Sequence, residues 1–216
     1  MQKLKIEYGG GILIERGKSR ILVDPSGRTP LIPDIVLVSH AHFDHSSGIW
    51  YSCLRRVPKV MTTVTRRILE SKSGKRLTNV IELNEGEYLD FKDFRIYAEP
   101  SGHCAGSLQF LISFKNIDLA YSGDFCIEKR AILESCHPFK ADIVIMEATY
   151  GNPKFVFPPR EHLYRRFLEW LKGVSDEYER VVVKCRTLGT AQEITMLLSL
   201  STINLPILVH EHVAKM

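Results

Sequence analysis

Residues 35–45 of the chain read Ile-Val-Leu-Val-Ser-His-Ala-His-Phe-Asp-His. The first four are apolar and mostly β-branched, which predicts a strand buried on both faces. This strand leads directly into four side chains that bind metals, all within six positions: His40, His42, Asp44 and His45. Four such groups cannot share one face of a helix or a strand, so we expect a tight loop that turns them inward.

Two distant positions complete the expected metal centre. His103 lies in a loop between two predicted strands, and Asp124 ends another predicted strand. Imidazoles suit zinc, and a carboxylate has two oxygens that can bridge two cations. We therefore expect two Zn²⁺ ions, one chelated by His40 and His42 and one by Asp44 and His45. In a two-metal hydrolase one cation activates water, and the pair holds the attacking and leaving oxygens.

The composition is that of a globular protein. Hydrophobic residues make up 44% of the 216 residues and charged residues 25%, which excludes a disordered or coiled-coil chain. The chain has no apolar run near the roughly 18 residues of a membrane helix, and its start lacks a signal-peptide core. Five cysteines without a C-x-x-C pair favour a reducing compartment, and hence a cytoplasmic location. The net charge of +4 permits binding to a polyanion.

The first two thirds of the chain alternate apolar and polar residues. Residues 4–23 predict a β-meander, and residues 59–71 predict a short strand and a helix. Four later segments predict strands of a largely antiparallel sheet, at residues 79–83, 94–98, 107–114 and 117–122.

The pattern changes after Asp142. A strand, helix, strand, helix and strand are predicted at residues 143–146, 161–172, 180–185, 190–200 and 205–209, an order that is typical of parallel pairing. The proline-rich residues 152–159 suggest a boundary. We expect one domain over residues 1–155, with residues 156–216 as an incomplete second domain or a segment that packs back on the first, because two helices and two strands bury little apolar surface alone.

The ordered ligands resemble those of the metallo-β-lactamase superfamily. Asp24, the loop at residues 40–45, His103 and Asp124 correspond in order to its successive motifs. This resemblance implies an α/β fold, the αβ/βα four-layer sandwich, with a dinuclear zinc site at one edge of its two sheets.

Three further segments are similar to the β-CASP nucleases of that superfamily. They are Gly102–Ser107 (GHCAGS), Asp142–Gly151 (DIVIMEATYG) and Leu188–Glu193 (LGTAQE). The second contains that branch's own acidic residue, here Glu147, and the third is similar to the start of its inserted parallel α/β domain. The branch includes the RNA-cleaving subunit of the polyadenylation factor, RNase J and DNA-repair nucleases. The resemblance therefore implies hydrolysis of nucleic acid, with RNA favoured as the partner.

The resemblance also implies roles for single residues. Asp44 would bind the second metal and accept a proton from the attacking water, while Asp24 and Glu147 would orient ligand imidazoles. Lys184 and Arg186 could hold the nucleic-acid backbone. The branch has two further histidines downstream without clear counterparts here. His210 is one candidate for the missing metal ligand, and His212 is a weaker one.

Other functions remain open from the sequence. An RNase Z-like nuclease would have a ligand histidine where Cys185 and Arg186 stand. The β-CASP-like segments count against a small-molecule hydrolase such as a lactonase or thioesterase. A truncated, inactive paralogue would keep the fold without activity. The sequence does not distinguish endonuclease from exonuclease action, and it leaves a homodimer open.

Overall fold

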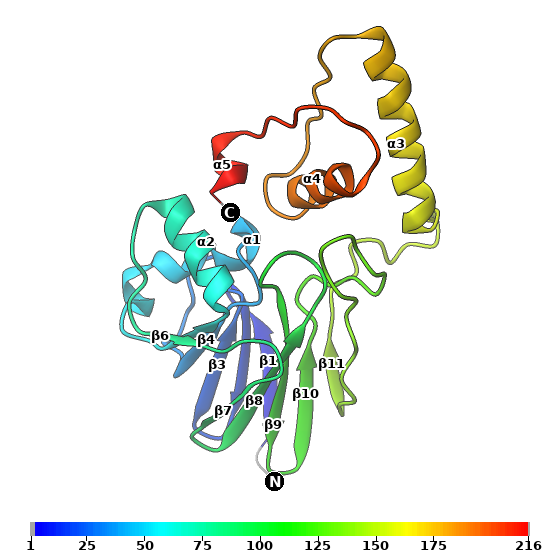
Figure 1. Ribbon diagram of the computed structural model, residues 1–216. Coiled ribbons are helices and arrows are strands. Elements are labelled where there is room, and N and C mark those ends of the chain that lie inside the picture. The colour runs from blue at the N-terminus through cyan, green and yellow to red at the C-terminus, as the bar shows by residue number, and fades with distance from the viewer. Residues whose placement is uncertain (1–2, 216) are drawn as a thin grey trace.

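The computed structural model describes residues 3–215, and two β-sheets face each other at its centre (Figure 1). The first sheet has six strands in chain order: β1 (Leu4–Tyr8), β2 (Ile12–Arg16), β3 (Ser19–Val23), β4 (Ile35–Leu37), β5 (Lys59–Met61) and β6 (Val80–Glu82). The second sheet has the order β11-β10-β9-β8-β7, from β7 (Tyr88–Phe91), β8 (Phe94–Pro100), β9 (Leu108–Phe114), β10 (Ile117–Tyr121) and β11 (Ile143–Ile145).

Strand directions confirm the meander and correct one prediction. β1, β2 and β3 pair antiparallel, whereas β4, β5 and β6 each run parallel to the strand before them. The segment predicted at residues 79–83 therefore belongs to the first sheet, not to an antiparallel sheet with the later strands. Helix α2 (Thr63–Ser73) connects β5 to β6, and a helical crossover joins parallel neighbours. In the second sheet only β11 pairs parallel, with β10.

Two apolar clusters pack against opposite faces of the first sheet. Ile21 and Val23 face the second sheet, whereas Leu22 between them faces the helices. This is the alternation of side chains expected along a strand. All three residues of β4 are fully buried, so the strand buried on both faces is confirmed. On the helical side lie α1 (Phe43–Ser46), α2 and two 3₁₀ turns at Ser47–Trp50 and Ser52–Leu54.

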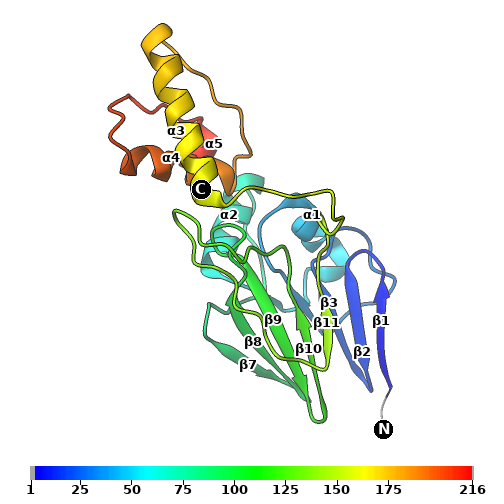
Figure 2. The same ribbon diagram turned by 90° about the vertical axis from the view of Figure 1, so that its right-hand side faces the viewer.

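Three later helices lie beyond one end of the two sheets, above α1 and α2 in both views (Figures 1 and 2). They are α3 (Arg160–Glu177), α4 (Thr190–Leu200) and α5 (Glu211–Ala214). The helices predicted at residues 161–172 and 190–200 are confirmed, and the first is longer than predicted. The expected boundary after residue 155 falls in the coil between β11 and α3 and stays a prediction.

The strands predicted at residues 180–185 and 205–209 are wrong, because both segments are coil. Val182 and Leu208, the apolar residues at their centres, are 90% and 95% exposed. A β-branched sequence forms a strand only where another strand satisfies its backbone groups. Among the described residues neither segment has such a partner. The expected parallel β-α-β-α-β unit is therefore not formed.

The fold class is confirmed as α/β, with two mixed sheets as in the metallo-β-lactamase fold. Across residues 3–215 the structure has no helix with both the length and the apolar character needed to cross a lipid bilayer.

Candidate metal centre

Three loops at the same end of the facing sheets bring the expected ligands together. His40 and His42 follow β4 of the first sheet, while His103 follows β8 and Asp124 follows β10 of the second. Each of these four offers one ligand atom, and these atoms all lie within 4.8 Å of one another. We call these residues, together with Asp44 and His45, the His/Asp cluster.

The ring nitrogens in the first half of the cluster stand at the spacing of ligands around one ion. His42 Nδ1 is 2.9 Å from His40 Nε2 and 3.1 Å from His103 Nε2. Nitrogens bound at 2.0–2.1 Å to a tetrahedral zinc lie roughly 3.3 Å apart. His40, His42 and His103 thus have the separation of three ligands that share a cation.

Hydrogen bonds outside the cluster decide which nitrogen of two rings carries the proton. The hydroxyl of Ser39 donates its one proton to Asp24 Oδ2, so it can only accept from His40 Nδ1, 2.9 Å away. The carbonyl of Leu188 accepts from His42 Nε2 at 3.3 Å. The lone pairs of His40 Nε2 and His42 Nδ1 therefore face each other with no proton between them. A shared cation satisfies such an arrangement.

The second half of the cluster gathers around His45. Its Nε2 atom is 3.3 Å from Asp124 Oδ1 and 3.7 Å from Asp44 Oδ2. The other oxygen of Asp124, Oδ2, is 3.4 Å from His103 Nε2 and 3.8 Å from His40 Nε2. Asp124 therefore presents one oxygen to each half of the cluster, as the sequence predicts for a bridging carboxylate. The Asp44 side chain is 78% exposed, so it borders the solvent side.

Asp24 lies behind the cluster and is hydrogen-bonded to one of its rings. Its carboxylate accepts hydrogen bonds from the amide and hydroxyl of Ser39, both at 2.6 Å, from Tyr121 Oη at 2.7 Å, and from His45 Nδ1 at 2.8 Å. The last of these leaves His45 Nε2 to face Asp44 and Asp124. Asp24 has a φ of 48°, in the left-handed region that aspartate tolerates better than most residues. These hydrogen bonds fit the orienting role expected for Asp24, which stays a prediction.

The charges of the cluster are unequal in the metal-free protein. Burial and the neighbouring imidazoles lower the pKa of His40 to about 2, and burial lowers the pKa of His103 to about 4. Burial also opposes protonation of His45, but its hydrogen bonds to Asp124 and Asp24 outweigh this and raise its pKa to about 10. Burial likewise opposes ionisation of Asp124, but the bond to His45 prevails and lowers its pKa to about 2. The metal-free cluster thus contains one imidazolium, His45, paired with carboxylates.

Other expected site residues lie outside the cluster. The Glu147 carboxylate accepts from the Thr149 amide at 2.9 Å, and its role in orienting an imidazole stays a prediction. His210 accepts from the amide of His212 at the start of α5. Neither of these histidines belongs to a group of metal-ligand atoms in residues 3–215. Lys184 and Arg186 are exposed in coil, not at the end of a strand.

Three functional groups were missed in the sequence. Ser39 and Tyr121 fix the position of Asp24, and the Leu188 carbonyl fixes the ring of His42. Ser39 directly precedes His40, and Tyr121 lies three residues before Asp124, so their place beside the motifs was the available signal. Nothing in the sequence indicates which backbone carbonyl reaches a histidine 146 positions away.

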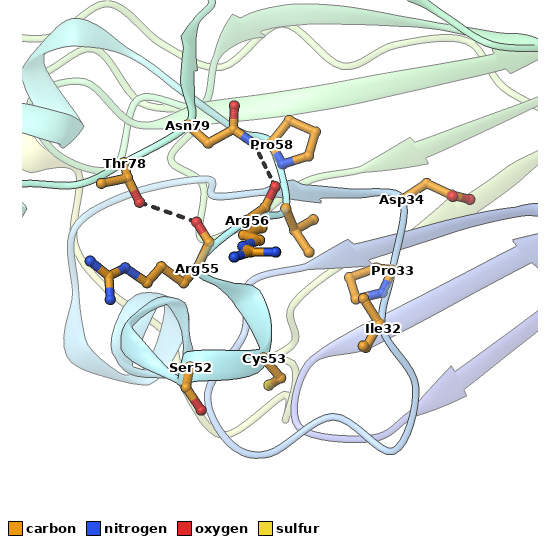
Figure 3. Close-up of a pocket in the computed structure, with 11 residues that line it drawn as sticks. Ile32, Pro33, Asp34, Ser52, Cys53, Arg55, Arg56, Pro58, Thr78 and Asn79 are labelled. Atoms are coloured by element: carbon orange, nitrogen blue, oxygen red, sulfur yellow. Dashed lines mark hydrogen bonds between the residues drawn. The ribbon is translucent and has the colours of Figure 1, made fainter.

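A separate hollow of about 1000 Å³ lies at the amino-terminal ends of the parallel strands β4, β5 and β6, away from the His/Asp cluster (Figure 3). Asp34, Pro58 and Asn79 line it, and they directly precede β4, β5 and β6, whereas the cluster follows the far end of β4. Arg55 and Arg56 border this hollow as well. It is distinct from the His/Asp cluster and shares no residue with it.

Comparison with known proteins defines the class. A family model described as the beta-lactamase superfamily domain matches residues 15–181. This range covers most of the chain, which therefore belongs to the beta-lactamase superfamily, and the recognition of that superfamily is confirmed. The matched range runs past residue 155 and includes the whole of α3.

Three curated relatives are similar over most of the chain. One is the endoribonuclease ysh1 of Emericella nidulans, 30% identical over 196 residues that cover 76% of this chain and 22% of the relative. An RNase J-like protein of Methanocaldococcus jannaschii is 24% identical over 86% of this chain and 50% of its own. A probable DNA ligase of Opitutus terrae is 29% identical over 83% and 17%. The chain thus spans half or less of the length of these relatives.

Proposed function

We propose that this chain is a metal-dependent phosphodiester hydrolase of the β-CASP type, which holds two Zn²⁺ ions and acts on RNA. The observation that carries the proposal is the convergence of histidine lone pairs in front of a carboxylate that faces both halves of the cluster. The names of two relatives, an endoribonuclease and an RNase J-like protein, support RNA as the substrate.

The donor set fits two zinc ions. His40, His42 and His103 would hold one, Asp44 and His45 the other, and Asp124 would contact both. Divalent cations held here would supply Lewis-acid chemistry, which polarises a phosphodiester and activates water.

The chain's own residues prepare this chemistry. Asp24 holds the proton of His45 on Nδ1, and Ser39 holds that of His40 on Nδ1, so that each ring presents Nε2. Asp44 is exposed on the solvent side of His45, where its carboxylate can accept a proton from an attacking water.

The test is hydrolysis of five substrates by the zinc-loaded chain: labelled single-stranded RNA, the same sequence as DNA, a chromogenic phosphodiester, a lactone and a thioester. We expect cleavage of RNA and of the phosphodiester, and its loss in Asp124→Asn. Turnover of only the lactone or thioester would overturn the proposal in favour of a small-molecule hydrolase. Metal binding without any turnover would favour the inactive paralogue.

DNA is the second candidate substrate. The similarity to a probable DNA ligase extends over 181 residues and includes most of the chain. Faster cleavage of DNA than of RNA in the same assay would select this alternative. Analysis of product lengths in either case separates exonuclease from endonuclease action.

We also propose a cytoplasmic location for this chain. All five cysteines are free thiols, which supports a reducing, cytoplasmic environment. The partner proposed is nucleic acid, and a homodimer stays a prediction that light scattering can check.

A further inference from the structure

The start of α4 lies against the metal centre. The Leu188 carbonyl accepts from His42, and a Cβ added to Gly189 would lie 3.8 Å from the carbonyl oxygen of His103. One segment, Leu188–Glu193, thus lies beside two cluster histidines from different sheets, and it follows them by more than eighty residues. Zinc coordination does not require this contact, so it calls for its own explanation.

Glu193 anchors this segment through a buried ion pair. Only 4% of Glu193 is exposed, although it is a charged residue on a helix. Its Oε2 atom is 3.3 Å from Arg130 Nε, an ion pair whose angles fall short of a hydrogen bond. Its Oε1 atom accepts from the Ala131 amide at 2.9 Å and from the Tyr164 hydroxyl. Glu193 therefore joins α4, α3 and the coil after β10.

Arg130 connects Glu193 to the backbone of His103 in the metal centre. Its Nη1 atom donates to the backbone carbonyl of His103, while its Nε faces Glu193. The Arg130 side chain is only 12% exposed, so a bulk-water partner cannot readily replace Glu193. Burying an ion pair costs the desolvation of both ions. A buried pair such as Arg130–Glu193 is therefore weak evidence for a contribution to stability.

We propose that Glu193 is a positioning residue which acts through Arg130 to fix the loop that carries His103. The affinity for metal then depends on α4 as well as on the ligands themselves. This inference rests on the metal site of the proposed function but not on the identity of the substrate. Partners behind a metal ligand commonly contribute a factor of roughly 10–100 in metal affinity.

The experiment compares Glu193→Gln with the wild-type chain. Glutamine has the same shape and can still accept from the Ala131 amide and Tyr164, but it removes the negative charge beside Arg130. The matched control is Glu169→Gln, on α3 and exposed. Metal affinity is measured by competition with a chromophoric chelator, for Zn²⁺ and for Co²⁺. The Co²⁺ absorption spectrum additionally reports the geometry of the ligands.

We expect Glu193→Gln to weaken the tighter-bound metal by about tenfold or more, with an altered Co²⁺ spectrum, and Glu169→Gln to bind like the wild type. Arg130→Gln should give the same loss. The double variant should lose no more than either single variant, because both residues act along one path. Circular dichroism establishes that each variant is folded.

Two results would overturn the inference. One is a folded Glu193→Gln with wild-type affinity and an unchanged Co²⁺ spectrum. The other is losses that simply add in the double variant. If Glu193→Gln does not fold, Arg130→Gln decides by the same criteria. Metal affinity is read without a substrate, so failure of the hydrolysis assay leaves this test intact, and the two failures are distinguishable.

Discussion

Three imidazoles of the His/Asp cluster have their protons placed by partners outside it. Ser39 does this for His40, the Leu188 carbonyl for His42, and Asp24 for His45. For His40 and His42 this leaves a lone pair directed into the cluster, whereas His45 directs Nε2 inward and has a free lone pair there only after the imidazolium loses a proton. At the scale of single residues, the site is therefore a set of rings whose orientation is fixed by hydrogen bonds from outside, and not merely a group of nearby histidines.

Replacing His42 tests the ligand assignment at this scale. We expect His42→Ala to lose about one equivalent of bound zinc, because three coordinating nitrogens become two. Elemental analysis after dialysis measures the stoichiometry. Cys104→Ser is the matched control, since Cys104 is buried nearby and burial raises the pKa of its thiol to about 12. Unchanged zinc in His42→Ala, or zinc lost from Cys104→Ser, would contradict the assignment.

The raised pKa of His45 predicts a proton released on metal binding. In the metal-free protein this ring stays protonated up to a pH of about 10. A metal at Nε2 requires the neutral ring, so affinity should rise with pH by up to about tenfold per unit below that pKa. His40 and His103, with pKa values of about 2 and 4, are already neutral and release nothing at pH 7.

Calorimetry in buffers of different protonation enthalpy measures that release. We expect close to one proton per metal bound at pH 7 in the second half of the cluster. A heat of binding independent of the buffer would show that His45 is neutral before the metal arrives.

At the scale of elements, the turn before α4 has a backbone that only glycine adopts readily. Gly189 has a φ of 96°, and the Cβ of an alanine there would meet only ordinary contacts, the nearest at 3.6 Å. The cost of Gly189→Ala is therefore one of backbone strain, about 1–3 kcal/mol of the free energy of unfolding. Relief of this strain would move the Leu188 carbonyl away from His42 and weaken metal binding.

Chemical denaturation and metal titration together measure this effect. Gly173→Ala is the matched control, because Gly173 lies inside α3 with nothing within 4 Å of the added Cβ. We expect that control to be neutral or stabilising by up to about 1 kcal/mol. Equal stability of the two variants would show that the turn before α4 is not under this constraint.

At the scale of the whole molecule, the cluster joins the two sheets. His40, His42 and His45 follow β4 of the first sheet, whereas His103 and Asp124 come from loops of the second. A bound metal therefore links the two halves of the sandwich, and its binding free energy adds to the stability of the folded state.

Removing the metal should lower the melting temperature. A metal present at a thousand times its dissociation constant contributes about 4 kcal/mol, which corresponds to a shift of roughly 10 °C for a chain of this size. Scanning calorimetry with and without a chelator measures the shift, and re-addition of Zn²⁺ should reverse it. The same melting temperature in both states would mean that no metal bridges the sheets.

The sequence by itself determined what is local along the chain. The apolar run at residues 35–38 and the ligands at residues 40–45 are contiguous, so their pattern predicted both the buried strand and the metal loop. The order of His103 and Asp124 after them followed from the motifs that the superfamily shares. Alternation likewise predicted most strands of the two sheets, because the side chains of a strand alternate between two environments.

Tertiary structure alone decided what depends on a partner distant in the chain. Residues 180–185 and 205–209 are rich in apolar side chains and look like strands, but within residues 3–215 no neighbouring strand pairs with them, and they are coil. Conversely, the contact of Leu188 with His42 and the path from Glu193 through Arg130 to His103 join segments that share no pattern. Backbone hydrogen bonds and buried charges are satisfied by whichever group the fold brings near, and only the folded chain specifies which group that is.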